Sequence, residues 1–107
     1  MLLSLVGLPG SGKTTVGRQL ARRLRLRFVD SDHAIEARLG CSIREFFERE
    51  GEPKFRDIEA EVIDELTQSQ DYVVSTGGGA VLRPLNRANL HDRSKVIYLK
   101  STPEELY

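Results

Sequence analysis

Residues 2–15 read LLSLVGLPGSGKTT, and this stretch decides the fold that the sequence predicts. Its first part is a nearly continuous apolar run, as expected of a strand buried on both faces of a parallel sheet. Gly7 to Thr14 then fits the pattern G-x-x-x-x-G-K-[ST] at every specified position. Val16, Leu20 and Leu24 recur every four residues, which puts them on one side of a helix. Strand, glycine loop and helix together predict a phosphate-binding loop.

The residue types of this loop suit a nucleoside triphosphate. Gly7, Gly10 and Gly12 can take backbone angles closed to other residues, so successive N–H groups can point at one anion. The following helix adds the positive end of its dipole. We expect Lys13 to reach the β- and γ-phosphates and the Thr14 hydroxyl to bind Mg²⁺; the alternative is a glycine-rich turn without a ligand. The nucleotide-binding residues predicted from the motif are Gly10, Ser11, Gly12, Lys13, Thr14 and Thr15.

Length and composition indicate a single domain. The chain has 107 residues, of which 39% are hydrophobic, enough for a modest core. Its formal net charge of zero argues against a general binder of nucleic acid or of a membrane surface, and the arginines between Arg18 and Arg27 are interpreted as a solvated helix face. A membrane span is not predicted, because no apolar run approaches ~18 residues. Cys41 is the only cysteine, which excludes an intrachain disulfide and favours the cytoplasm.

Two aspartates follow a second predicted strand at residues 28–29. Asp30 and Asp32 should project to the same side if the chain stays extended there. Carboxylates at the carboxyl end of a strand, near a magnesium nucleotide, suit metal binding and general-base chemistry. The alternative is a helix cap, in which Asp32 or Ser31 caps a helix that begins near Ala34.

Three helices are predicted between the second and third strands: residues 34–39, a helix from Ser42 to the break at residues 51–53, and one with apolar positions from 55 to 66. Arg56 lies near the start of the last one, where the helix dipole disfavours a cation. Its fork of donors suits a carboxylate, either that of a ligand or that of Glu59, and both interpretations remain open. We expect residues 31–70 to form a lobe over the strand ends.

A third strand at residues 72–74 leads directly into Ser75-Thr76-Gly77-Gly78-Gly79. Three glycines at a strand end cost chain entropy, which favours a close backbone approach to another group over a plain flexible turn. A short helix at 84–91 and a fourth strand at 96–99 follow. Ser101 or Thr102, with Pro103 behind it, is typical of the start of a further helix.

Four segments together resemble the shikimate kinase family in order and spacing: Gly7–Thr14, Asp30-Ser31-Asp32, Gly51-Glu52 with Phe55-Arg56, and Ser75–Gly79. The resemblance implies transfer of the ATP γ-phosphate to the 3-hydroxyl of shikimate in aromatic amino-acid biosynthesis. It also implies an α/β fold of the P-loop nucleoside-monophosphate-kinase type, in three layers with a parallel sheet in the order 2-3-1-4-5. Residues 1–107 would form one such domain, with the fifth strand and the lid of the family absent from it.

The resemblance assigns roles at the nucleotide. Lys13 corresponds to the catalytic phosphate-binding lysine, Thr14 to the Mg²⁺ ligand and Asp30 to the outer-shell partner of the metal. ATP is the implied co-substrate and Mg²⁺ the implied cofactor.

The resemblance also assigns the substrate site. Asp32 would hold shikimate hydroxyls and accept the proton of the attacking one. Arg56 would bind the shikimate carboxylate, with Glu59 holding its guanidinium in place, and Gly77, Gly78 and Gly79 would line the pocket with backbone. A carboxylate needs a fork-shaped cation, and vicinal hydroxyls need an acceptor, so the substrate's chemistry agrees.

Family members continue with an arginine-bearing lid, a second arginine for the shikimate carboxylate and a fifth strand. Phosphoryl transfer depends on such charges, so we expect the 107-residue chain by itself to be nearly inactive, with an uncovered edge on its fourth strand. We expect a cytoplasmic monomer without nucleic-acid or membrane partners. The alternatives are a kinase of another small hydroxy acid or polyol such as gluconate, a nucleoside-monophosphate kinase, and a non-catalytic nucleotide-binding fragment.

Overall fold

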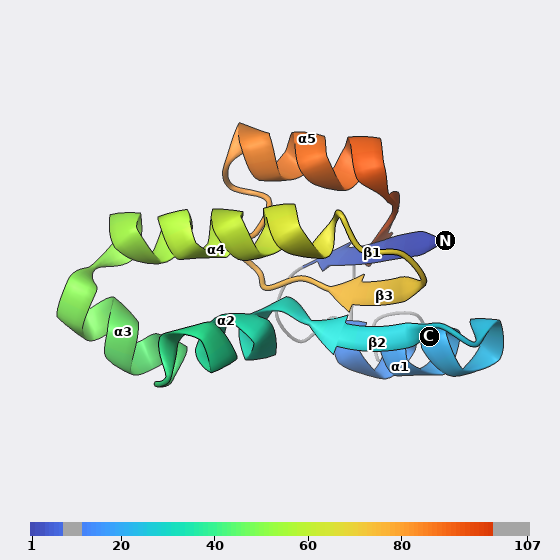
Figure 1. Cartoon of the computed structure of the whole chain (residues 1–107), viewed down its shortest axis with the longest axis horizontal. Coiled ribbons are helices and arrows are strands. Elements are labelled where there is room, and N and C mark those ends of the chain that lie inside the picture. The colour runs from blue at the N-terminus through green and yellow to red at the C-terminus, as the bar shows by residue number, and fades with distance from the viewer. Residues whose placement is uncertain (8–11, 100–107) are drawn as a thin grey trace.

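The computed structural model describes residues 1–7 and 12–99. The predicted site residues Gly10 and Ser11, and the helix expected after Ser101, lie outside these ranges. No helix within them is long and apolar enough to cross a membrane. The elements follow one another as β1 (Leu2–Gly7), α1 (Lys13–Leu24), β2 (Arg27–Asp30), α2 (Ser31–Leu39), α3 (Ile43–Glu50), α4 (Glu52–Leu66), β3 (Tyr72–Ser75), α5 (Pro84–Arg93) and β4 (Lys95–Leu99), most of them labelled in Figure 1.

The four strands form one parallel sheet in the order β2-β3-β1-β4, which confirms the predicted order 2-3-1-4. Helix α1 covers one face of the sheet, and α4 and α5 cover the other, so the molecule has three layers (Figure 1). Because all strands run in the same direction, their carboxyl ends meet at one edge, where ligands bind in sheets of this kind.

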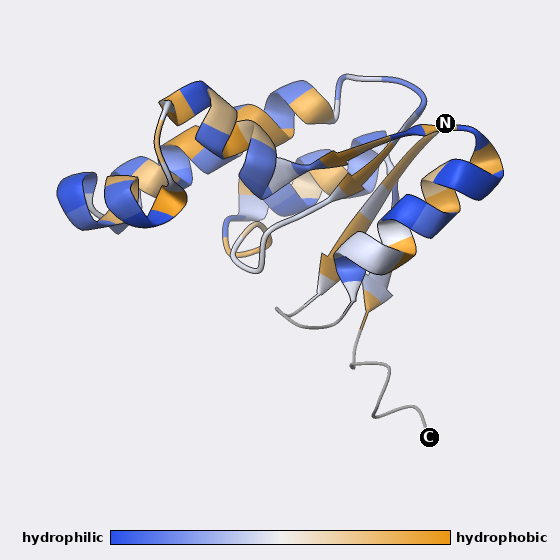
Figure 2. Cartoon of the chain, turned by 90° about the horizontal axis from the view of Figure 1, so that it is seen from below, coloured by the Kyte–Doolittle hydropathy of each residue, from blue (hydrophilic) through white to orange (hydrophobic). Residues whose placement is uncertain are grey.

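Strand β1 is the centre of this sheet and is buried from Leu2 to Val6, as predicted. Figure 2 shows hydrophobic strands between helices whose hydropathy alternates around the axis. On one face Leu3 and Leu5 pack with Ala21 of α1, and on the other Val6 packs with apolar side chains of α4 and α5. The core therefore lies on both sides of β1 and fixes the position of this strand, after which the phosphate loop is predicted.

The inward side of α1 differs from the predicted one. Gly17 and Ala21 are buried, whereas Leu24 is exposed, so the prediction that Leu24 shares the buried side is wrong. The helix approaches the sheet so closely that a Cβ atom on Gly17 would lie 2.6 Å from Cε1 of Phe28. Only small residues fit along this line of contact, and the larger apolar side chains of α1 flank it.

Helix α2 begins at Ser31, three residues before the predicted start at Ala34. Its cap is Asp30, whose Oδ1 accepts a hydrogen bond from the backbone N–H of Asp32 at 2.9 Å. The alternative interpretation, in which Asp32 or Ser31 caps this helix, is therefore wrong. A carboxylate that takes up an N-terminal N–H group stabilises a helix start, so the chain leaves its extended conformation directly after β2.

Helices α2, α3 and α4 pack around an apolar cluster of their own, formed by Ile35, Phe55 and Val62 with partly buried neighbours. The Ser42 hydroxyl caps α3 by accepting the N–H of Glu45 at 3.1 Å, as the sequence predicts. Gly51, with φ at 88°, ends α3 and begins α4. This cluster sets the three helices beside the carboxyl ends of β2 and β3.

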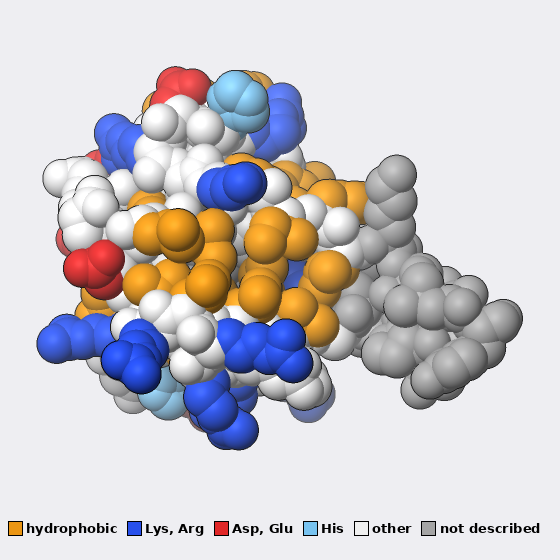
Figure 3. All heavy atoms as spheres, turned by 90° about the vertical axis from the view of Figure 1, so that its right-hand side faces the viewer, with side chains coloured by type: hydrophobic (Ala, Val, Ile, Leu, Met, Phe, Trp, Pro, Cys, Tyr) orange, Lys and Arg blue, Asp and Glu red, His pale blue; other side chains and the backbone are white. Residues whose placement is uncertain are grey.

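The β4 side of the sheet is more open than its centre. Within the described part of the chain β4 pairs only with β1, and its side chains Val96 and Tyr98 are exposed. On the face at the right of Figure 1, hydrophobic side chains gather between groups of Lys and Arg side chains (Figure 3).

Candidate functional site

A cavity of about 360 Å³ lies at the carboxyl ends of the strands. Three segments line it: the start of α1, the junction of β2 with α2, and the end of β3 with the glycine turn after it. Its lining residues are Gly12, Lys13, Thr14, Thr15, Asp30, Asp32, Ser75, Thr76, Gly77 and Gly78. Folding thus brings predicted nucleotide, metal and substrate residues together in one cavity.

The start of α1 is built to receive an anion. Gly12 precedes the helix with φ at 87°, no described side chain caps the first turn, and that turn contains no acidic residue. The first N–H groups of a helix without a side-chain cap, together with the helix dipole, attract negative charge. Lys13 is buried here, and its Nζ donates to the carbonyl oxygen of Gly7 at 2.8 Å. Burial lowers the pKa of Lys13, and the nearby carboxylates of Asp32 and Asp30 oppose this change.

Asp30 and Asp32 reach the cavity by different routes. Asp30 is the extended residue at the end of β2, whereas Asp32 lies in the first turn of α2. Both still line the same cavity, although the chain between them is not extended. Burial raises the pKa of Asp32 most, and the charges of Asp30 and Glu36 raise it further, while Lys13 and Arg56 lower it. A carboxylate with a raised pKa is the better proton acceptor near neutral pH.

Arg56 is held from behind by Glu59, which is only 1% exposed. The Nη1 atom of Arg56 donates to Oε1 of Glu59 at 3.0 Å. Because Glu59 is buried, this ion pair does not lie on the surface. Burial raises the pKa of Glu59, and Arg56 opposes the shift. The Arg56 Nη2 atom is 3.9 Å from Glu52, too far for a hydrogen bond, and Nε has no acceptor among the described residues. Glu59 therefore accepts a hydrogen bond from Nη1 and from neither Nε nor Nη2 of Arg56.

The glycine turn lies directly against the side chains of Asp32 and Arg56. A Cβ atom on Gly77 would overlap the Asp32 carboxylate, and one on Gly79 would overlap the Arg56 guanidinium. The predicted close approach of the glycine backbone is therefore, at these two positions, an approach to the chain's own side chains. Arg56 and Gly79 are not among the lining residues of the cavity and lie next to it, beyond Gly78.

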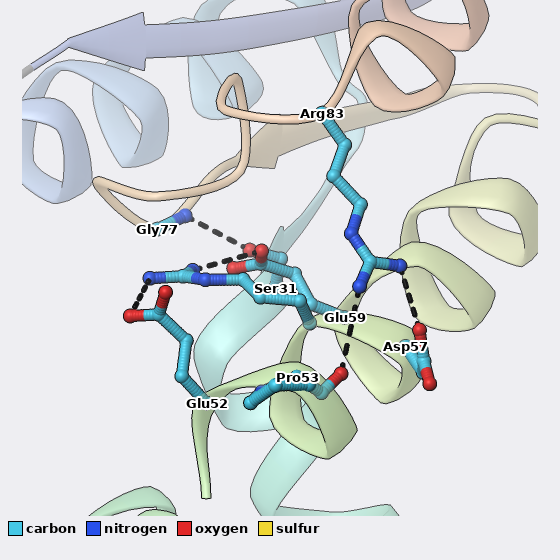
Figure 4. A network of polar contacts seen from close by, with 8 residues as sticks. Ser31, Glu52, Pro53, Asp57, Glu59, Gly77 and Arg83 are labelled. Atoms are coloured by element: carbon cyan, nitrogen blue, oxygen red, sulfur yellow. Dashed lines mark hydrogen bonds and ion pairs between the residues drawn. The ribbon is translucent and has the colours of Figure 1, made fainter.

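Four polar residues of the site are not predicted from the sequence. Ser75 and Thr76 line the cavity, and their place at a strand end is the same signal that singles out Asp30. Ser31 accepts a hydrogen bond from Gly77, and Arg83 reaches from the loop before α5 to Asp57 and the Pro53 carbonyl of α4 (Figure 4). These three hydrogen bonds join residues that are 46, 26 and 30 positions apart, so no local pattern indicates them.

The chain is similar to known shikimate kinases. A family model described as shikimate kinase matches residues 9–107. The shikimate kinase of Paracidovorax citrulli is 60% identical over 107 residues, covering 98% of this chain and 58% of that protein. That of Ralstonia nicotianae is 62% identical over 102 residues, covering 95% and 54%. A solved structure of the Acinetobacter baumannii shikimate kinase in complex with shikimate has a TM-score of 0.92 at 50% identity, covering 98% of this chain and 58% of that one.

The similarity includes the fold and nearly the whole sequence. The chain spans a little more than half the length of these relatives. Family model, sequence identity and the agreement in fold all lead to the same group of ATP-dependent kinases. On this evidence of sequence and fold, the chain belongs to the shikimate kinase family.

Proposed function

We propose that the chain carries the nucleotide and shikimate sites of a shikimate kinase, which transfers the γ-phosphate of ATP to the 3-hydroxyl of shikimate. One observation carries the proposal: Asp32 and Arg56 both lie against one glycine turn, beside the helix start that bears Lys13. A compact ring with a carboxylate and neighbouring hydroxyls matches an arginine, an acceptor carboxylate and bare backbone at this spacing.

The carboxylate of the substrate would bind Arg56. Glu59 holds Nη1, and the Nε and Nη2 donors make no hydrogen bond to the described residues. Nε is buried in the free chain, so the substrate carboxylate would pair with Nη2 in a charge-assisted hydrogen bond. The pairing with Glu59 fixes the guanidinium plane beforehand, which reduces the entropy lost on binding.

The Asp32 carboxylate would accept hydrogen bonds from the substrate hydroxyls and the proton of the attacking one. Its raised pKa suits this role, since proton transfer is most effective when the pKa of the base is near the working pH. Lys13 would hold the phosphates in line with that hydroxyl. Positioning and charge supply most of the catalysis in phosphoryl transfer.

The donor set fits Mg²⁺, the metal that we propose accompanies ATP. Thr14 and Asp30 line the cavity and offer oxygen atoms, which this ion prefers. Among the described residues no group of three or more His, Cys, Asp or Glu side chains is placed to hold a metal. That suits an ion held largely by phosphates and water. When bound, it offsets charge on the β- and γ-phosphate oxygens.

The lobe of residues 31–70 is the proposed shikimate-binding part of the domain. It supplies Asp32, Arg56 and Glu59, and its helices share one apolar cluster. We propose a cytoplasmic monomer without nucleic-acid or membrane partners, in keeping with the zero net charge and the single cysteine.

Titration calorimetry of the purified chain with MgADP and then with shikimate tests the proposal. We expect both ligands to bind, and gluconate, an open-chain hydroxy acid, to bind at least tenfold more weakly than shikimate. Absence of shikimate binding, or equal binding of gluconate, would overturn the substrate assignment. Binding of MgADP alone would favour a nucleotide-binding fragment.

An assay of ADP release with ATP, Mg²⁺ and shikimate tests how fast the 107-residue chain turns over. We expect the 107-residue chain by itself to turn over slowly, because an arginine placed at a transferring phosphoryl group contributes ~10³-fold or more in related systems. Turnover close to that of the complete relatives would show this expectation to be wrong, while it would support the kinase function.

A further inference from the structure

Ser31 connects helix α2 to the glycine turn after β3, in the proposed substrate half of the cleft. Its side chain is 0% exposed, and its Oγ accepts a hydrogen bond from the backbone N–H of Gly77 at 3.0 Å. Figure 4 shows the two residues facing each other, one at the start of α2 and the other in the turn after β3. The bond therefore joins the lobe to the glycine turn.

The Ser31 hydroxyl takes the place of a strand carbonyl. The Thr76 N–H continues the ladder toward β1 by donating to Leu5 at 3.0 Å, and the next N–H, that of Gly77, points to the β2 side. Strand β2 ends at Asp30, however, and the chain turns into α2. The side-chain oxygen of the first helical residue supplies the acceptor that the strand no longer offers.

The Gly77 end of this hydrogen bond is next to the Asp32 carboxylate. Ser31 precedes Asp32 in the chain, and Gly77 lies so close to the same carboxylate that a side chain there would overlap it. The hydrogen bond thus sets how near the glycine backbone and the carboxylate lie to each other. That spacing is the width of the pocket at the group that would receive the substrate hydroxyls.

We infer that Ser31 is a positioning residue for shikimate, which acts by holding Gly77 against Asp32 and not by touching the substrate. The inference rests on the proposed function. It predicts an effect on shikimate binding but not on nucleotide binding. Loss of the Ser31 hydroxyl would change the pocket beside Asp32 and leave the start of α1 as it is.

Ser4 provides a matched control. It is also 0% exposed, and its hydroxyl lies 2.7 Å from the hydroxyl of Ser94, between β1 and the end of α5. Ser4→Ala removes a buried hydroxyl of the same size, while Ser94 keeps the hydrogen bond that its hydroxyl donates to the Leu90 carbonyl at 2.6 Å. A general loss of stability would therefore appear in both variants.

The test compares Ser31→Ala with Ser4→Ala in the whole chain, by calorimetric titration with shikimate and with MgADP. We expect Ser31→Ala to weaken shikimate binding about tenfold, since displacement of the pocket wall beside Asp32 would cost about one hydrogen bond to a charged group. MgADP binding should stay within twofold. Ser4→Ala should leave both affinities within twofold. Hydrogen exchange of the Gly77 amide, read by NMR, should become faster in Ser31→Ala only.

Three outcomes would overturn the inference: unchanged shikimate affinity in Ser31→Ala, equal losses for both ligands, and a Ser31→Ala chain that does not fold. Ser31→Thr keeps the oxygen and should retain affinity within threefold; a loss as large as that of alanine in a folded chain would also count against it. Failure of the wild-type chain to bind shikimate would instead refute the proposed function.

Discussion

The two ends of the cleft are built in different ways. The phosphate end comes from one continuous segment, in which β1 leads through the loop into Lys13 and Thr14 of α1. The substrate end comes from three separate segments that carry Asp32, Arg56 and the glycine turn. We propose that residues of the first end bind a ligand directly, whereas Glu59 and Ser31 of the second end hold a neighbouring residue.

Burial has opposite effects on the pKa values at the two ends. It lowers the pKa of Lys13 and raises those of Asp32 and Glu59, so in each case the charged form is disfavoured. The charges of Lys13 and Asp32 also stabilise each other across the cavity. The two ends are therefore built from different segments but interact through their charges. Substitutions at each end test whether nucleotide binding and shikimate binding change independently.

Lys13→Met should have the largest effect. It removes the ammonium that we propose binds the β- and γ-phosphates. ADP retains the first of these, and a hydrogen bond between charged groups makes a difference of up to ~10²-fold in affinity. Titration with MgADP measures the loss, and shikimate affinity should change far less. Lys95→Met, on the exposed start of β4, is the control that should leave both affinities unchanged. Tight MgADP binding by Lys13→Met would refute the assignment.

Gly79→Ala should come second, with a roughly thirtyfold loss of shikimate affinity and unchanged MgADP binding. The new methyl group would overlap the end of the Arg56 side chain, which can move aside, so the fold should survive.

Gly40→Ala is the control for this substitution. Its φ is +72° and no atom lies near its added methyl group, so the change should cost about 1 kcal/mol of stability without affecting binding. If Gly79→Ala binds shikimate normally, Arg56 does not hold the substrate.

Asp32→Asn should weaken shikimate binding about tenfold at neutral pH while it makes the chain more stable. The folded chain raises the Asp32 pKa, so between the ordinary and the raised value it binds more protons than the unfolded chain. Stability therefore rises as the pH falls through this window, and the advantage of Asp32→Asn should disappear there. Shikimate binding by the wild type should decline over the same range.

Thermal unfolding and calorimetric titration between pH 4 and pH 8 measure the two effects separately. Opposite pH trends for stability and binding are the expected result. A variant that is less stable than the wild type at neutral pH would show that the Asp32 charge stabilises the fold, contrary to the raised pKa.

Arg83→Gln should have the smallest effect, about twofold in shikimate affinity. Its ion pair with Asp57 joins the loop before α5 to α4 at 2.7 Å, but the two side chains are 38% and 67% exposed, and such pairs contribute at most about 1 kcal/mol. The double variant Arg83→Glu/Asp57→Arg should restore the affinity. A tenfold loss, insensitive to salt, would mean that this contact holds Arg56 in place.

Local patterns predicted a large part of the fold and of the site. Glycine spacing, apolar runs and capping residues indicated the phosphate loop, the four strands and the cap of α3, because these features depend on residues a few positions apart. Burial of Leu24 and the start of α2 were predicted wrongly. The first depends on how closely α1 approaches the sheet, and the second on the Asp30 carboxylate turning back to its own helix.

Taken by itself, the sequence predicted a phosphate-binding loop after the first strand and a ligand site that includes Asp30, Asp32, Arg56 and three glycines. Tertiary structure decided that Glu59 is buried behind Arg56, that Gly77 and Gly79 press against the chain's own side chains, and that Ser31 completes the ladder of β3. The physical reason is range: a helix, a turn or a phosphate loop is specified by neighbours in the chain. A buried hydrogen bond between residues 46 positions apart exists only after the sheet has brought them together.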